Sequence, residues 1–187
     1  SSDGLNWKQV GQNFNKSTID SYWDPNYVVF EGTRQGLYVR NSPAYFKFYI
    51  YRDAYTPIAA ECPANQYGTT VLANRYPPNS LNDIHNNDWA LYAGVEFGND
   101  EEYVKTPDSL TFTASSATSG GVIEVWLDSL DSGNKIAECV ISNTGDWDTY
   151  NTFTTNIRQP VSDNLYVYLK FKRNGADKIF ILQWLTF

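Results

Sequence analysis

The chain has 187 residues, 42% of them hydrophobic, so its length allows one large domain or one ordinary domain plus a further segment. No stretch holds 18 consecutive apolar residues, which argues against a membrane-spanning helix and a membrane partner. With 14 basic against 21 acidic residues the net charge is −7, and such a chain repels the phosphate backbone of nucleic acid. Nucleic acid is therefore not expected as a partner.

Aromatic residues make up 16% of the chain, with 14 Tyr and 6 Trp, while Met is absent. Tyr and Trp combine a flat apolar face with a polar edge, which suits β-sheet surfaces and stacking sites. The composition favours an all-β binding protein. Because the sequence begins with Ser and carries no recognisable signal peptide, we expect it to be a piece of a longer chain.

Residues 1–55 predict a β-strand segment. Its apolar runs, separated by Gly, Asn-Ser-Pro and Asp-Pro signals, lie at residues 7–10, 27–30, 36–39 and 44–51. Four short strands make a poor independent core, so this segment is expected to pack on other strands or to be the tail of a preceding β-sandwich domain. Residues 52–57 predict a linker, and a second domain is predicted over residues 56–187.

The second domain has the length of a β-sandwich. Its alternating apolar runs lie at residues 89–97, 110–114, 122–128, 165–171 and 178–187. Residues 72–87, rich in Asn and Pro, predict a long loop. Helical periodicity never extends beyond a turn or two, and no repeat is found. The sequence therefore predicts an all-β, jelly-roll β-sandwich with extra N-terminal strands.

Trp147 stands out because it lies in a polar Thr-Gly-Asp-Trp turn between runs that already have apolar faces of their own. The C–H face of a sugar ring stacks on the π-face of Trp, while the sugar hydroxyls need polar partners. Polar side chains in this turn and in the later 174–177 turn could supply these partners: Asn143, Asp146, Asp148, Asn174 and Asp177. The alternative is that Trp147 caps one end of the core.

Several segments of the second domain occur together in an ordered set. They are Ala60-Glu61, 87–98, 120–129, 144–147, 165–171 and 180–187. In this order and spacing, residues 57–187 resemble the family 6 carbohydrate-binding modules of secreted polysaccharide-degrading enzymes. The resemblance implies a jelly-roll β-sandwich with two possible sugar sites, one in the loops at an end and one on a concave sheet face.

The resemblance places Trp147 where the family's stacking tryptophan stands in the loop site. The tyrosine that usually completes this aromatic pair falls near Asp83 or Ile84, and the usual C-terminal asparagine is Ile181. Two parts of the loop site are therefore altered in this chain.

Trp89 matches the family's tryptophan on the concave face, but its place at the start of an alternating strand favours a half-buried residue over a binding one. Either Tyr76 folds over from the long loop to replace the missing ring, or binding has moved to the Trp89 face, or it has been lost. The candidate sugar-binding residues are Trp147, Trp89, Tyr76, Asp83, Asn174 and Asp177. The lone His85, which lies among asparagines, is expected to face solvent.

The resemblance also implies a structural calcium ion, held by acidic residues of the first strand and by an aspartate before the final tryptophan. Glu61 is present, but the acid two residues earlier is Ala59 and the aspartate is Gln183. Calcium takes six or more oxygen ligands, and an amide oxygen can serve among them. A calcium site at Glu61 and Gln183 is thus possible.

Two cysteines, Cys62 and Cys139, allow either a single disulfide bridge or buried thiols, and Cys139 shares a predicted strand face with Ala137 and Ile141. They do not make a metal site, because a second pair of ligands is missing.

Residues 1–55 are similar, over short patterns at 2–7 and 32–39, to the end of the β-sandwich domain of some family 43 glycoside hydrolases. Together the two resemblances imply a secreted, monomeric, non-catalytic module. It would bind a polysaccharide or oligosaccharide, such as xylan or a related plant-wall glycan, beside a catalytic domain in cis. One alternative is a spacer β-sandwich with a degenerate sugar site. Another is a fragment with glycoside hydrolase activity, whose carboxylate pair would come from Glu96, Glu124 and Asp128.

Overall fold

The computed structural model describes residues 51–72, 79–98 and 105–187 and divides the chain into two units, Ser1–Tyr51 and Arg52–Phe187. Apart from Tyr51, the described residues all lie in the second unit. The strands predicted in the first 50 residues lie outside the described part, and so does Tyr76. The predicted domain boundary after residue 55 therefore stays a prediction.

The second unit is built from two β-sheets. Sheet A contains β1 (Arg52–Asp53), β3 (Asn65–Tyr67), β6 (Trp89–Glu96), β8 (Gly121–Leu127), β9 (Asn134–Ile141) and β11 (Asn164–Lys172). Sheet B contains β2 (Ile58–Ala59), β4 (Thr70–Leu72), β5 (Ser80–Asn82), β7 (Ser109–Ser115), β10 (Asn151–Asn156) and β12 (Ile181–Thr186).

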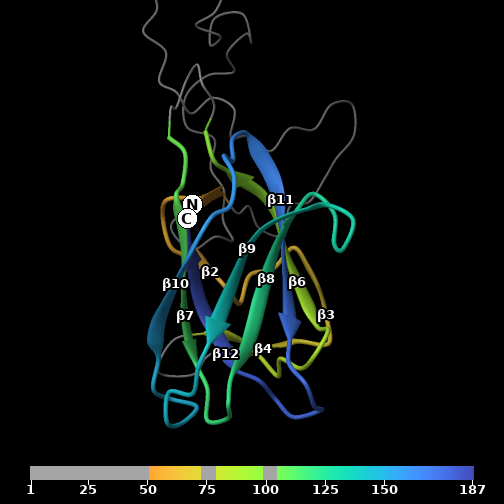
Figure 1. Cartoon of the computed structure of the whole chain (residues 1–187), viewed down its shortest axis with the longest axis vertical. Coiled ribbons are helices and arrows are strands. Elements are labelled where there is room, and N and C mark those ends of the chain that lie inside the picture. The colour runs from red at the N-terminus through yellow and green to blue at the C-terminus, as the bar shows by residue number, and fades with distance from the viewer. Residues whose placement is uncertain (1–50, 73–78, 99–104) are drawn as a thin grey trace, which may run out of the picture. The chain divides into compact units, whose positions relative to one another are not determined.

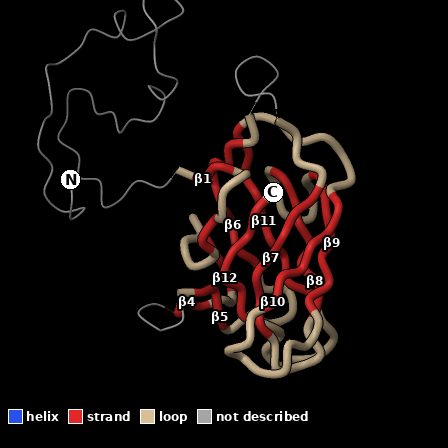
Figure 2. The backbone as a smooth tube through the Cα atoms, turned by 90° about the vertical axis from the view of Figure 1, so that its left-hand side faces the viewer, coloured by secondary structure: helices blue, strands red, loops and turns tan. Residues whose placement is uncertain are grey.

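Sheet A has the order β1-β6-β11-β8-β9, with β3 also pairing β6. Sheet B has the order β10-β7-β12-β5-β4, with β2 also pairing β12. All of these pairs are antiparallel except β1–β6. The two sheets pack face to face (Figures 1 and 2), which confirms the predicted jelly-roll β-sandwich.

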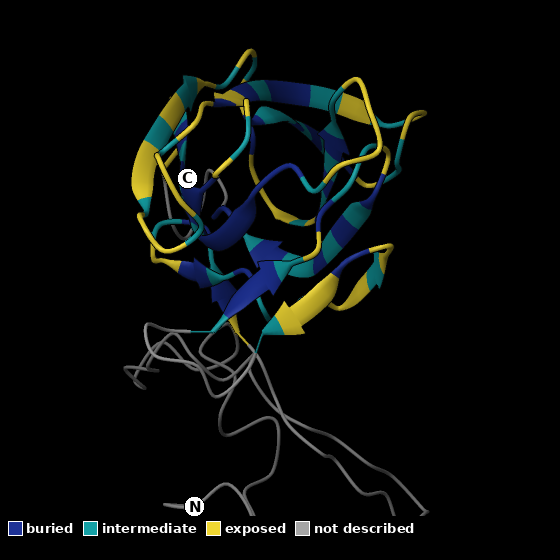
Figure 3. Ribbon diagram, turned by 90° about the horizontal axis from the view of Figure 1, so that it is seen from below, coloured by how far each residue is buried: buried dark blue, intermediate teal, exposed yellow. Residues whose placement is uncertain are grey.

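The core lies between the sheets and follows from strand alternation. Along β7, β8 and β11 every second side chain is buried, because successive residues of a strand point to opposite faces (Figure 3). The largest fully buried side chains include Tyr92, Phe97, Phe112, Phe171 and Phe180. The described residues form no helix, and thus no helix that is long and apolar enough to cross a membrane.

The linker predicted at residues 52–57 is wrong. Its first two residues form β1, which pairs with the end of β6, and Ala54 is fully buried. The Arg52 guanidinium donates hydrogen bonds to the carbonyl oxygens of Ala93 (2.9 Å) and Cys62 (2.6 Å). Because buried polar groups need such partners, Arg52 helps to fix this edge of the sandwich.

The long loop predicted at residues 72–87 is also wrong in part, since β5 lies within it and pairs with both β4 and β12. Leu81 and Ile84 are fully buried. Two isolated apolar residues among asparagines and prolines do not form an alternating pattern. The sequence therefore did not indicate that Leu81 and Ile84 are part of the core. The strand β10 was not predicted either, because its sequence contains Phe153 as its one large apolar side chain.

Both cysteines are free thiols. Cys139 is buried on the inward face of β9 together with Ala137 and Ile141, and burial raises its pKa to about 11. The buried-thiol interpretation of Cys139 is therefore confirmed.

Four connections meet at one end of the sandwich, the lower end in Figure 1. They are the β5–β6, β7–β8, β9–β10 and β11–β12 loops, at residues 83–88, 116–120, 142–150 and 173–180. This end is called the loop end below, and it carries Trp147.

Candidate functional site

The Trp147 loop is held closed by its own side chains. The Asp146 carboxylate accepts hydrogen bonds from the backbone N–H groups of Asp148 (2.8 Å) and Thr149 (2.6 Å) and from the Thr149 hydroxyl (3.1 Å). These bonds, that of the Asp148 N–H first, lower the pKa of Asp146 below its usual value of 3.8. The Asn143 side chain accepts from Gly145 N–H, so the turn is fixed on both sides of Trp147.

Two serines, Ser115 at the end of β7 and Ser116 at the start of the β7–β8 loop, tie the Trp147 loop to the rest of the loop end. The Ser115 hydroxyl donates to the carbonyl oxygen of Trp147 (2.8 Å), and Ser116 exchanges hydrogen bonds with Thr144. The Ser116 hydroxyl also donates to the carbonyl oxygen of Ile179 (2.6 Å), in the β11–β12 loop. The two loops on either side of the site are thus joined through one buried serine.

The residue on the Trp147 ring is Lys178. Its ammonium nitrogen lies 4.3 Å from the ring centroid and donates a hydrogen bond to the Asn82 side-chain oxygen (2.5 Å). This is cation–π geometry. Among the described residues no aromatic ring contacts Trp147, and the group found over its ring is the Lys178 ammonium. Tyr76, the predicted aromatic partner, lies outside the described part.

A second cation stands beside Lys178. The Arg173 guanidinium donates to the Thr118 hydroxyl (2.9 Å) and to the carbonyl oxygen of Lys178 (3.3 Å), and its backbone N–H donates to Asn86 (3.0 Å). The 173–180 loop thus carries two basic side chains, Arg173 and Lys178, in a chain whose net charge is −7.

Three further predicted residues lie at the same end. Asp83, in the β5–β6 loop, is exposed and has φ +55°, while Asn174 and Asp177 are exposed in the β11–β12 loop. The structure thus brings these three residues to the end that carries Trp147. His85 is half-buried rather than fully exposed, and its ring lies between the Asp83 carbonyl oxygen (2.8 Å) and the Asp88 carboxylate (3.6 Å).

Trp89 is on the outer face of sheet A, away from the loop site. Its ring centroid is 6.0 Å from that of Tyr168 on β11, with the planes tilted by 58°. Tyr67, its cross-strand neighbour on β3, is 66% exposed, and Tyr166 is 50% exposed. These four residues form a partly exposed aromatic surface, called the outer aromatic face below.

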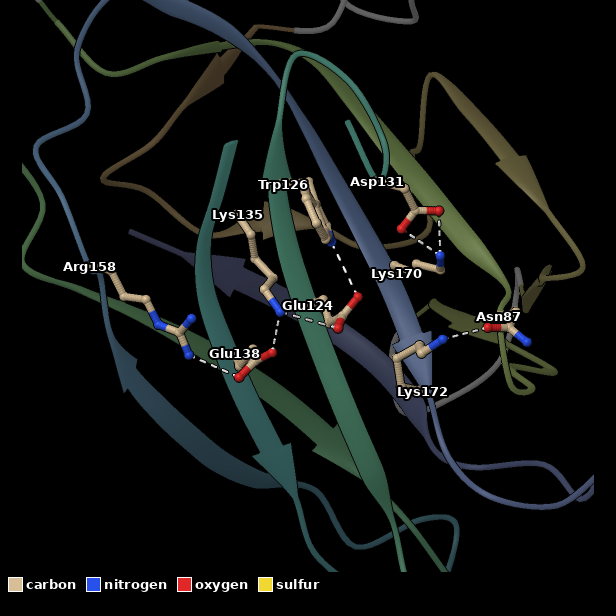
Figure 4. A network of polar contacts seen from close by, with 9 residues as sticks. All are labelled: Asn87, Glu124, Trp126, Asp131, Lys135, Glu138, Arg158, Lys170 and Lys172. Atoms are coloured by element: carbon tan, nitrogen blue, oxygen red, sulfur yellow. Dashed lines mark hydrogen bonds and ion pairs between the residues drawn. The ribbon is translucent and has the colours of Figure 1, made fainter. Parts of the chain in front are cut away.

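Further along sheet A, charged side chains form a network of polar contacts (Figure 4). Lys135 contacts Glu124 and Glu138, and Arg158 contacts Glu138 (2.9 Å). The hydrogen bond from Lys135 raises the pKa of that lysine and lowers the pKa of Glu138. Lys170 pairs with Asp131, from the loop that crosses the face. Charged side chains thus flank the outer aromatic face.

The carboxylates weighed for hydrolysis all have structural partners. Glu124 accepts from Trp126 and Lys135, and Glu96 accepts from Gly98 N–H (3.1 Å) and the Asn164 amide (3.2 Å). Asp128 accepts from the Tyr166 N–H (3.2 Å). Glu96 and Glu124 stand on strands separated by β11.

The residues predicted for calcium lie near one another in the fold. Ala60 N–H donates to the Gln183 carbonyl oxygen (2.9 Å), so Glu61 follows directly on a residue paired with Gln183. One Glu61 carboxylate oxygen is buried and lacks a hydrogen-bond partner, and Gln183 is buried. A hard cation satisfies such an oxygen, so these residues fit calcium. Among the described residues, however, no group of three or more His, Cys, Asp or Glu converges there.

A two-sheet jelly-roll with an aromatic side chain held in the loops at one end has the architecture of a sugar-binding module. Residues 59–187 match the family model "Carbohydrate binding module (family 6)", and the chain belongs to this family. The family consists of non-catalytic modules that are often attached to glycoside hydrolases. The expected resemblance and the expected absence of catalysis are therefore confirmed.

Comparisons with individual proteins agree. The chain is 26% identical over 159 residues to endo-1,4-beta-xylanase A of Thermoclostridium stercorarium, a match that covers 81% of this chain and 29% of that protein. A family 6 module from Clostridium cellulolyticum, solved in complex with xylose, is 33% identical with a TM-score of 0.64, covering 73% of this chain and 98% of that one.

A family 43 arabinoxylan arabinofuranohydrolase from Bacillus subtilis, solved in complex with cellotetraose, shares the fold. The identity is 23% and the TM-score 0.63, and the match covers 74% of this chain and 28% of that one. The chain thus spans less than a third of the length of each of these two enzymes.

Sequence reasoning found Trp147 but missed the residues around its ring. Three residues were not predicted: Lys178, which lies over the ring, Asn82, which accepts the hydrogen bond of Lys178, and Ser116, which joins the Trp147 loop to the next loop. A lysine just before an apolar strand is common, so only the excess of basic residues at 170–178 in an acidic chain pointed this way.

Proposed function

We propose that this module binds plant-wall polysaccharide, xylan or a related β-glycan, by stacking a sugar ring on Trp147. The binding would hold a linked catalytic domain at its substrate and so raise the local substrate concentration that this domain meets. The secreted location, the catalytic domain in cis and the monomeric state belong to the same proposal, which is supported by the similarity to a xylanase.

The observation that carries the proposal is the fixed presentation of Trp147. Its loop is closed by Asp146 and anchored by Ser115, although the ring is only half-buried. A tryptophan needed only for the core would not require a hydrogen-bonded polar turn to hold it at the edge. Indole rings offer an apolar, electron-rich face of the kind that sugar C–H groups contact.

Affinity electrophoresis through soluble xylan, β-glucan, arabinan and laminarin tests the proposal. Wild-type protein is expected to be retarded by at least one polymer, and Trp147→Ala is expected to abolish that retardation. Trp89→Ala is the matched control, since it removes the same side chain from a different surface. Thermal melts of each variant show that the fold is retained.

Two outcomes would contradict the proposal. No retardation of the wild-type protein on any polymer would favour a spacer with a degenerate site. Retardation lost only in Trp89→Ala would move binding to the outer aromatic face. That second site is favoured by the Trp89–Tyr168 ring pair and the exposed Tyr67 ring. Reducing-sugar release from the same polymers would instead reveal hydrolysis.

We also propose that calcium binds at Glu61 with the help of Gln183. The orphaned carboxylate oxygen of Glu61 supports this assignment, because a buried charge without a partner is unfavourable. Bound calcium would hold the start of sheet B against its last strand.

A further inference from the structure

We infer that the Trp147 site selects glycans that carry carboxylate groups, that is uronic acid residues, and that Lys178 determines this selectivity. The inference rests on the proposed function, since it concerns the ligand class of the same site.

The first step is the position of the lysine. Its ammonium nitrogen lies over one face of the Trp147 ring, 4.3 Å from the ring centroid, and we take this face as the stacking surface. A neutral sugar that stacks there has to displace the ammonium from the ring and from its 2.5 Å hydrogen bond to Asn82. It offers no charge in return. The Lys178 ammonium therefore competes with a neutral glycan for the face of the Trp147 ring.

The second step is the charge around the ring. Arg173 stands next to Lys178 and donates to the Thr118 hydroxyl and to the Lys178 carbonyl oxygen, which are neutral acceptors. A carboxylate on the ligand would meet the Lys178 ammonium over the ring, and Arg173 adds a second positive charge in the same loop. Hydrogen bonds between charged donors and carboxylates are stronger than neutral ones. A uronic acid thus gives the displaced ammonium a new partner, which a neutral sugar does not.

The third step concerns the acids of the same loops. The Asp146 carboxylate is turned into its own loop by three hydrogen bonds, whereas Asp148 and Asp177 are exposed. With these acids and a net charge of −7, the chain repels a densely charged polyanion. The surface fits a mostly neutral chain with isolated uronic acid substituents.

The test compares one polymer with its own neutral form: glucuronoxylan and the same glucuronoxylan after chemical reduction of its carboxyl groups. Affinity is measured by affinity electrophoresis and titration calorimetry for the wild type, Trp147→Ala, Lys178→Gln and Lys105→Gln. The last is a matched control, since Lys105 also places its ammonium over an aromatic ring, that of Tyr55 at 3.8 Å.

We expect the wild type to bind the native polymer about two- to fivefold more tightly than the reduced one, the range of a surface ion pair. Lys178→Gln should lose this preference and bind the reduced polymer at least as well as the wild type does. Raising the salt concentration should remove the preference in the wild type. Lys105→Gln should behave as the wild type.

Each contrary outcome has its own meaning. If the wild type binds both polymers equally and Trp147→Ala weakens both, the proposed function stands and the selectivity is overturned. If Lys178→Gln keeps the preference, Lys178 is not its source. If the wild type binds neither polymer, nor any neutral glycan, the proposed function itself fails.

Discussion

Asp146 shows how one side chain can set the geometry of a binding loop. Its carboxylate accepts three hydrogen bonds from the two residues that follow Trp147. An ionised carboxylate accepts all three, whereas the protonated form accepts less well. The conformation of the loop therefore depends on the ionisation of a fully exposed group.

The pH dependence follows from the sign of the pKa shift. Because the folded protein lowers the pKa of Asp146, its stabilising effect is present above the usual value of 3.8 and is lost as pH falls through the lowered pKa. An NMR titration of the Asp148 and Thr149 amide signals should show a midpoint below 3.8. In Asp146→Asn this transition should be absent. A wild-type midpoint at or above 3.8 would contradict the assignment.

Two glycines at the loop end give a matched pair of substitutions. Gly120 and Gly145 both have positive φ, +75° and +103°. A Cβ atom on Gly120 would lie 1.8 Å from the Ile141 carbonyl oxygen, whereas one on Gly145 would meet nothing within 4 Å. Gly145→Ala should therefore lower the free energy of unfolding by the backbone strain alone, about 1–2 kcal/mol.

Gly120→Ala should cost more than Gly145→Ala, because the backbone of β9 has to move as well. Urea denaturation of the two variants beside the wild type measures the difference. Equal midpoints for the two variants would show that the backbone of the loop end moves at little cost in free energy. That result would conflict with the hydrogen bonds that join its loops.

At the scale of the elements, β8 and β9 contribute to stability in two ways, through a buried apolar side chain and through exposed ion pairs. Ile123 points inward from β8 and is fully buried, whereas Glu138 points outward from β9 and pairs with Lys135 and Arg158. Removing buried methyl groups leaves a cavity, while the Glu138 contacts are partly exposed and screened by water.

Ile123→Ala should thus lower the free energy of unfolding by about 2–5 kcal/mol. Glu138→Gln should lower it by less than about 1 kcal/mol, and less still at high salt. Both are measured by urea denaturation at low and high salt. A loss from Glu138→Gln as large as that from Ile123→Ala would mean that the ion network, rather than the core, holds the two strands together.

The same elements show what the sequence can and cannot reveal. Strands such as β6, β8 and β11 were predicted because large apolar side chains alternate with polar ones over seven residues or more. The short strands β1, β4 and β5 were missed, since two or three residues are too few to show a period. Their partners lie far away in sequence, as in the pairing of Leu81 with Leu182.

At the scale of the whole molecule, the candidate site was predictable only in outline. Trp147 could be found because its turn is polar and stands between strands. The role of Lys178 could not be found, because Lys178 lies 31 positions after Trp147. It reaches the Trp147 ring only when β5, β7 and β12 pair in register. Sequence patterns report local structure, whereas a cation placed over a ring depends on the complete fold.

Calcium binding at Glu61 should be visible in the stability of the whole molecule. A ligand bound only by the native state stabilises that state, so removal of calcium should lower the melting temperature. We expect EGTA to do so in the wild type and to have no effect in Glu61→Gln, whose melting temperature should already be lower. An unchanged wild-type melting temperature after exhaustive chelation would argue against calcium at Glu61.

Ser116 sits at the junction of the Trp147 loop and the Lys178 segment, and this has a thermodynamic consequence. Because both loops are already hydrogen-bonded to it in the free protein, a glycan would find a preorganised surface and would freeze few backbone torsions on binding. Its affinity would be limited by the small area of one ring. Only lengthening the contact along the glycan chain, or linking a second module, would then make binding much tighter.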